Sequence, residues 1–237
     1  MAAIERADGT IATALLLLGG SLAAFVGLLV YRQKRKRGYR ALGQRLGLSY
    51  TYRRRRKGRD MPILAGADRW RTTARHFLQG SIGDIDIGIT DAEALEPRIS
   101  DDRDRRTHAN TQHYDLGSCN FTTTVALRSP TLDLPIFDIT PRDEAADAMK
   151  GDFGIRDFDD PHFVHNNKVE GPEAERITQA LSVKIRDLLR ENRTVSIGGS
   201  RDVIVLFHHM RVMSFEEIEA TVRLGRQLVA ALGDPKR

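Results

Sequence analysis

The longest uninterrupted apolar stretch of the chain lies near its N-terminus. Residues 11–31 read IATALLLLGGSLAAFVGLLVY and contain no charged side chain. As a helix rising about 1.5 Å per residue, this stretch reaches roughly 30 Å, the thickness of a bilayer core. A cleaved signal peptide would need a basic start and a shorter apolar region, whereas residues 1–10 are net negative. The pattern therefore predicts one transmembrane helix at residues 11–31, after a short extracytoplasmic N-terminus at residues 1–10.

After residue 74 the apolar positions recur at every second residue, which is the period of a half-buried strand. Ile85, Ile87 and Ile89 alternate with polar or small residues, and residues 74–79 are predicted to be the partner strand. Residues 93–113 are polar and are predicted to form a flexible loop.

Two further segments have the composition of strands, at residues 121–127 and 132–139. Prolines in and around the second segment confine it to an edge or to an irregular strand. Both segments fit the same sheet as the alternating isoleucines.

The C-terminal third changes to the 3.6-residue period of helices. An apolar face from Ile177 to Leu188 predicts a helix over residues 172–191, and a hairpin is predicted over residues 194–207 with its turn at Gly198-Gly199. Ser214 and Glu217 have the spacing of a capping box that starts a last helix. The predicted fold class is therefore α+β, with a single N-terminal transmembrane helix followed by a mainly antiparallel sheet domain with two C-terminal helices.

The charge is divided sharply along the chain. The whole chain is net +5, yet residues 32–59 hold thirteen basic residues and no acidic one, and residues 60–237 hold 23 basic and 30 acidic residues. Because basic residues follow the apolar run, the positive-inside rule places residues 60–237 in the cytoplasm as an α+β domain. The predicted localisation is the cell membrane, with one span and a cytoplasmic C-terminal domain. The single cysteine excludes a disulfide framework.

Residues 32–59 form a basic juxtamembrane segment with two possible roles. The segment could bind anionic lipid headgroups, or it could stay solvated and only fix the topology. The predicted lipid-binding residues are Arg32, Lys34, Arg35, Lys36, Arg37, Arg53, Arg54, Arg55, Arg56 and Lys57. The predicted partners are the lipid bilayer, its anionic headgroups and a protein of unknown identity.

The sequence offers no complete catalytic motif. Asp152-Phe153-Gly154 spells a kinase motif without the glycine-rich loop, strand lysine or catalytic loop that kinases need. The densest polar cluster, which holds carboxylates and imidazoles at short spacing, is a candidate for a divalent cation, but phenylalanines interleave with it as in a packed loop. Its candidate ligands are Asp157, Asp159, His162 and His165. We therefore predict no catalytic residue, no metal and no cofactor.

Ten residues of the C-terminal half fit a longer sequence pattern: Leu134, Pro135, Ile136, Phe137, Asp157, Phe158, Pro161, Phe163, Gly171 and Glu173. In this pattern an LPxFxLxP run comes before DIDFxxxPxF. The chain thereby resembles a bacterial family of uncharacterised membrane proteins with a domain of unknown function. Asn166-Asn167 stand where the family has a tyrosine. The resemblance covers roughly residues 70–232 and implies membrane anchoring, but it implies no activity.

The leading hypothesis is a membrane-anchored, non-catalytic scaffold or regulatory module. Two alternatives stay open: a metal-dependent hydrolase using the Asp/His loop, and a module that binds anionic lipid or nucleic acid through residues 32–59.

Overall fold

The structure, a computed structural model, describes residues 25–52, 70–97, 122–142, 154–208 and 211–233. One helix spans residues 25–46. The later elements are β1 (Ser49–Tyr52), β2 (Trp70–Ile82), β3 (Ile85–Pro97), β4 (Thr122–Arg128), β5 (Leu134–Pro141), α3 (Pro161–Asn166), β6 (Asn167–Glu170), α4 (Ala174–Ala180), α5 (Val183–Glu191), β7 (Ser196–Arg201), β8 (Val203–Phe207) and α6 (Phe215–Leu232).

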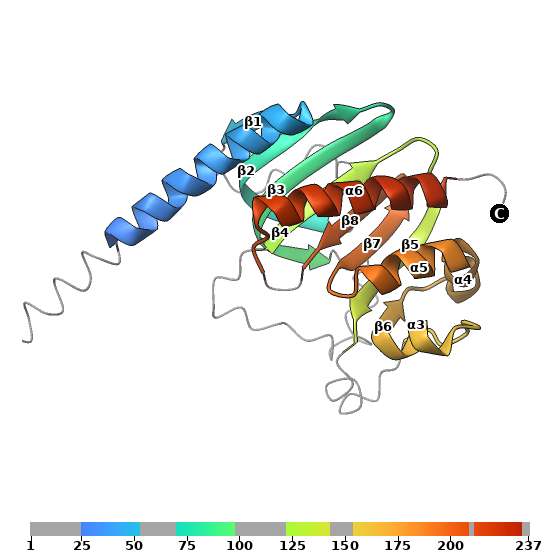
Figure 1. Cartoon of the computed structure of the whole chain (residues 1–237). Coiled ribbons are helices and arrows are strands. Elements are labelled where there is room, and N and C mark those ends of the chain that lie inside the picture. Colours follow the sequence, from blue (N-terminus) through green and yellow to red (C-terminus); the bar gives the residue numbers. More distant parts are fainter. Residues whose placement is uncertain (1–24, 53–69, 98–121, 143–153, 209–210, 234–237) are drawn as a thin grey trace, which may run out of the picture.

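The eight strands form one antiparallel sheet in the order β1-β2-β3-β4-β8-β7-β5-β6. Figure 1 shows α6 lying across this sheet, and α3, α4 and α5 grouped near β5 and β6. The helix of residues 25–46 packs its C-terminal half near β1 and β2, and its N-terminal half extends outward from the body (Figure 1).

The core lies between the sheet and α6. Residues that face each other across neighbouring strands share a face of the sheet, so the strand register aligns an apolar row through six strands. This row consists of Leu78, Ile89, Val125, Leu206, Ile197 and Ile139, all buried. Helix α6 packs close to the sheet because Gly225 has no side chain; a Cβ there would collide with Leu127.

The predicted transmembrane helix is wrong. Within the residues that the structure describes, no helix is both long and apolar enough to cross a membrane. Residues 25–31 of the apolar run begin the helix of residues 25–46, and the next six residues include five basic ones. Residues 11–24 of the predicted span lie outside the described residues. The finding overturns the predicted single-pass topology and the membrane localisation that rested on the same run.

The predicted number of helices is also wrong, because five helices are present among the described residues instead of one span and two C-terminal helices. The helix expected over residues 172–191 is divided into α4 and α5. Ser182 takes an extended backbone conformation before α5, and both Leu181 and Ile185 stay buried. The short helix α3 begins at Pro161, where Asp160 caps it.

The hairpin turn also lies elsewhere than predicted. Gly198 and Gly199 belong to strand β7, and the turn falls at Arg201 and Asp202, where Arg201 has a positive φ of 53°. Gly199 serves packing, because a Cβ on it would collide with the Phe137 ring from β5. Residues 93–97 of the predicted loop instead belong to strand β3, which continues to Pro97; residues 98–113 lie outside the described residues.

Candidate functional site

The first described residues of the N-terminal helix, residues 25–31, form a concentrated apolar surface. Six large apolar side chains are each between 44% and 56% exposed: Phe25, Val26, Leu28, Leu29, Val30 and Tyr31. Because they are nearly consecutive in the sequence, they point to all sides of the helix instead of forming one stripe. Exposed apolar clusters of this size mark contact with a protein, a ligand or lipid.

Basic side chains follow directly on the same helix. Arg32, Lys34, Arg37 and Arg40 are exposed, and Lys36 is half-buried. Within the described part of the chain, none of the five makes an ion pair with a carboxylate. We call them the unpaired cations. Their charge is therefore free to act on an external anion.

Five arginines of the folded body, by contrast, form ion pairs with carboxylates. Arg128, Arg176, Arg186, Arg190 and Arg211 each have an aspartate or glutamate within 4 Å.

Two of the unpaired cations lie over tyrosine rings of β1. The Lys36 Nζ is 5.3 Å from the centroid of Tyr52, and the Arg40 guanidinium is 5.8 Å from that of Tyr50. Tyr52 is 50% exposed. The next residues in the sequence are Arg53 to Lys57, predicted to bind lipid, and they lie outside the described residues.

Arg35, one of the predicted lipid-binding residues, faces the opposite way. Its Nε and Nη2 donate to the two carboxylate oxygens of Asp91 on β3, each over 2.9 Å, in a bidentate ion pair. Its Nη1 donates to the Met213 carbonyl over 2.8 Å. The guanidinium also lies 4.6 Å from the ring centroid of Phe215. Arg35 is 9% exposed, so it holds the helix to the body and is not available at the surface.

The Asp91 carboxylate is saturated by further donors. The Tyr39 hydroxyl donates to it over 2.6 Å, and the Thr123 hydroxyl over 2.7 Å. Thr123 in turn accepts from the Met213 amide over 3.0 Å. This network, the buried anchor, joins the N-terminal helix to β3, to β4 and to the chain just before α6. Buried charges need such complete pairing because desolvation penalises each one.

The buried anchor also shifts the ionisation of its members. Burial by itself would lower the pKa of Arg35, but the hydrogen bond and negative charge of Asp91 outweigh it and raise that pKa. Burial, followed by the charge of Asp91, raises the pKa of Tyr39 well above its usual value. Arg35 therefore stays charged and Tyr39 neutral across the physiological pH range.

Aromatic rings surround the buried anchor. The Tyr39 ring stacks on His76 with centroids 5.1 Å apart and an interplanar angle of 7°, and it meets the Phe215 ring edge-on at 5.6 Å. The Tyr50 hydroxyl lies 2.9 Å from the His76 Nδ1. These contacts fix the helix beside β1 and β2.

The residues proposed as metal ligands do not form one centre. Asp159 pairs with Arg186 over 2.8 Å, whereas Asp157, His162 and His165 are exposed. No group of three or more possible His, Cys, Asp or Glu ligands occurs among the residues that the structure describes. The neighbouring Asp160 accepts from the Phe163 amide and pairs with Arg190, so it caps α3 and ties it to α5. The backbone amide of Phe163 is the main cause that lowers the pKa of Asp160.

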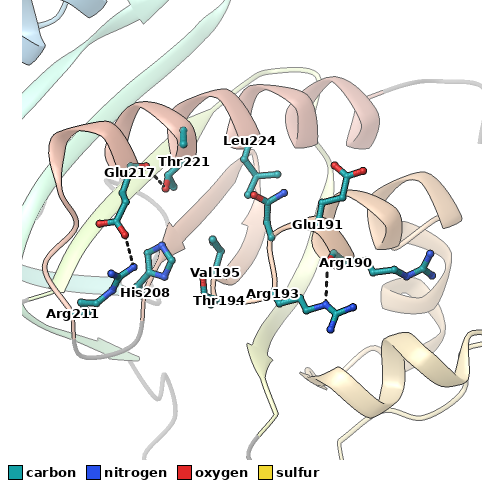
Figure 2. A pocket seen from close by; sticks show the side chains of 12 residues that line it. Arg190, Glu191, Arg193, Thr194, Val195, His208, Arg211, Glu217, Thr221 and Leu224 are labelled. Carbon is teal, nitrogen blue, oxygen red and sulfur yellow. Dashed lines mark hydrogen bonds and ion pairs between the residues drawn. The ribbon is translucent and has the colours of Figure 1, made fainter.

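A cleft of about 410 Å³ opens between the C-terminal end of α5 and the start of α6 (Figure 2). Figure 2 shows His208, at the end of β8, beside Arg211, which pairs with Glu217 of α6 over 2.8 Å. His208 is 7% exposed. Burial, aided by the charge of Arg211, lowers the pKa of His208. Sequence reasoning did not find this cleft.

The sequence did contain one signal for the buried anchor. Asp91 continues the series Ile85, Ile87 and Ile89, so the strand period alone places its carboxylate on the buried face. An acid at such a position needs a buried cation. The partner, Arg35, lies 56 residues away among many arginines, and nothing in the sequence distinguishes it from them.

Comparison with known proteins adds a likeness of fold. The chain matches no family model and shows no significant match to a curated protein. Its fold is similar to the crystal structure of the mycobacterial trehalose monomycolate transport factor A, TtfA, with a TM-score of 0.51 and 11% sequence identity. The match covers 83% of this chain and 94% of the TtfA chain. At this identity the likeness shows the fold alone.

Proposed function

We propose that the chain is a non-catalytic, lipid-binding accessory factor in lipid transport, and that it contacts anionic lipid headgroups through its N-terminal helix. The observation that carries the proposal is the arrangement of that helix: an exposed apolar start, then the unpaired cations, all held to the folded body by the buried anchor. The fold likeness supports the transport role, because the similar protein is by its name a factor for transporting a lipid.

The surface of the helix matches the two chemistries of a lipid. The apolar side chains of residues 25–31 suit acyl chains, and the cations that follow suit phosphate or other anionic headgroups. Each basic residue near an anionic lipid surface contributes about 1 kcal/mol, and this contribution falls off within a Debye length of about 10 Å at 0.1 M salt. Four exposed cations are therefore enough for salt-sensitive binding.

The buried anchor fixes the position of the lipid-binding helix relative to the folded body. A helix attached by surface contacts alone would move independently of the sheet. Here a bidentate ion pair, a hydrogen bond to Met213 and aromatic packing fix the helix to three other segments. Lipid bound at the helix is thus held at a defined place on the body.

Vesicle flotation with the full chain tests the proposal. We expect binding to vesicles of phosphatidylcholine with phosphatidylglycerol, weaker binding to phosphatidylcholine alone, and release from the anionic vesicles by high salt. Lys34→Glu with Arg37→Glu removes at least about 2 kcal/mol, or about 30-fold in affinity.

The matched control reverses two exposed arginines of α6, Arg223→Glu with Arg226→Glu, which makes the same change in net charge at another surface. This control should bind like the unmodified chain. Equal losses in both double variants would indicate a general charge effect and contradict the proposal. Loss of duplex DNA binding in Lys34→Glu with Arg37→Glu, with vesicle binding unchanged, would instead favour nucleic acid as the partner. The protein partner expected from the sequence stays a prediction.

A further inference from the structure

The cleft between α5 and α6 points to a second binding site with a different chemistry. We propose that this cleft binds a neutral, hydroxyl-rich ring, such as the sugar of a glycolipid headgroup. The inference rests on the proposed role in lipid transport, since it names the class of headgroup that the cargo would carry. It concerns a surface formed by the end of α5, the residues that follow α5 and β8, and the first half of α6, and this surface is separate from the unpaired cations of the N-terminal helix.

The charges in the cleft are largely balanced within the protein. Arg211 pairs with Glu217 over 2.8 Å, and Arg190 pairs with Asp160 and Asp187 over 2.9 and 2.8 Å. A free anion would meet the Glu217 carboxylate, and a free cation would meet the guanidinium groups. A ligand without net charge avoids both repulsions.

The cleft contains both hydrogen-bond acceptors and hydrogen-bond donors that the described residues of the protein do not use. His208 donates from its ring to the Thr194 carbonyl, so the neutral imidazole has its second ring nitrogen as an acceptor. Asn192 uses its amide nitrogen to donate to the Leu188 carbonyl, which leaves its amide oxygen as a second acceptor. Arg193 donates through Nε to the Arg190 carbonyl, which leaves its terminal nitrogens as donors.

A hydroxyl group both donates and accepts, so a ring with several hydroxyls can satisfy these groups together. The volume of about 410 Å³ lies within the range of roughly 300–1,000 Å³ that small-molecule sites occupy. Ala220, together with Val195 and Leu224, which Figure 2 labels, adds apolar atoms to the lining, against which the C–H face of a sugar ring can pack.

Saturation-transfer NMR and calorimetric titration of the full chain with trehalose test this inference, with inorganic phosphate as the anionic comparison. We expect millimolar binding of trehalose and no competition by phosphate. Arg193→Ala, at an exposed position that should not affect folding, and His208→Phe, which removes the acceptor, should each weaken binding about tenfold. Arg45→Ala, on the N-terminal helix, should leave trehalose binding unchanged.

A second readout identifies the atom involved. Nitrogen-15 NMR of the histidine rings should show a shift of the accepting His208 nitrogen on addition of trehalose. Binding that survives in both cleft variants, or stronger binding of phosphate than of trehalose, would overturn the inference, as would the absence of any trehalose signal. Vesicle binding through the unpaired cations is measured separately, so either proposal can fail while the other holds.

Discussion

Replacing Arg35 by methionine tests the central structural claim, that the buried anchor fixes the N-terminal helix to the body. Methionine keeps much of the side-chain volume but removes the guanidinium that donates to Asp91, Met213 and Thr123. The Asp91 carboxylate, 10% exposed, would then be left as a buried charge without its cation.

The size of the effect follows from what remains around Asp91. Removing one partner of a buried ion pair costs about 3–5 kcal/mol, mostly because the other charge stays buried and unpaired. Tyr39 and Thr123 still donate their hydroxyls to the carboxylate, so we expect the lower end of that range. A loss of about 3 kcal/mol corresponds to roughly 100-fold in the equilibrium between the attached and detached helix.

Two measurements on the full chain separate detachment of the helix from unfolding of the body. Urea unfolding followed by circular dichroism reports global stability, and hydrogen exchange reports local opening. In Arg35→Met we expect exchange to rise most at residues 36–46 and at residues 211–214, and less in strands β4, β7 and β8. Adding Asp91→Leu removes the unpaired charge and should recover part of the loss, which a double-mutant cycle quantifies.

The control is Arg45→Met on the same helix. Arg45 pairs with Glu219 over 2.6 Å, but its side chain is 54% exposed, and an exposed pair contributes about 0–1 kcal/mol. The reasoning is refuted if Arg35→Met loses no more stability than Arg45→Met, or if exchange rises uniformly over the sheet.

Three other predictions concern the rest of the fold. Asp160→Ala should destabilise the chain by about 0.5–2 kcal/mol in urea unfolding, because α3 loses its N-cap and α5 its link to Asp160; Asp160→Asn, which can still cap, should lose less. Because burial lowers the pKa of His208 in the folded state, stability should fall as pH drops below about 6.5, the ordinary pKa of histidine, and His208→Phe should flatten that part of the pH–stability curve. Gly225→Ala should destabilise by about 1–3 kcal/mol, since its Cβ would collide with Leu127, whereas the exposed neighbour Arg226→Ala should change stability by less than about 0.5 kcal/mol.

The parts of the fold that follow a regular period could be predicted from the sequence, and those that depend on long-range contacts could not. The alternation at Ile85, Ile87 and Ile89 locates β3, and the Ser214–Glu217 pair marks the start of α6, where both capping hydrogen bonds are present. The break at Ser182 leaves the apolar spacing intact, so periodicity alone reads α4 and α5 as one helix. Gly198-Gly199 resembles a turn in sequence, but Phe137 from another strand decides that the pair lies within β7.

In the candidate site, too, the sequence predicts what depends on local composition and does not predict what depends on long-range contacts. Composition identifies the basic segment, yet it cannot distinguish Arg35, which is buried, from Lys34 and Lys36 beside it. That distinction depends on which side of the helix meets Asp91, and the register between helix and sheet is set by packing around Tyr39. The sequence did not indicate the cleft for a similar reason. Its polar groups come from segments before and after the β7–β8 hairpin, and they share no sequence motif.

The contacts also connect the two proposed sites through a short series of interactions. Arg35 donates to the carbonyl of Met213, and the next residue, Ser214, caps α6 and exchanges hydrogen bonds with Glu217. Glu217 then pairs with Arg211 at the cleft. Each step is a covalent bond, a hydrogen bond or an ion pair of 3.2 Å or less, and the exposed pair of Arg211 with Glu217 is the weakest link of the series. If both proposals hold, this series of contacts would set the distance between the lipid surface at the N-terminal helix and the headgroup in the cleft, and breaking its central link with Ser214→Ala should weaken the coupling between the two binding events.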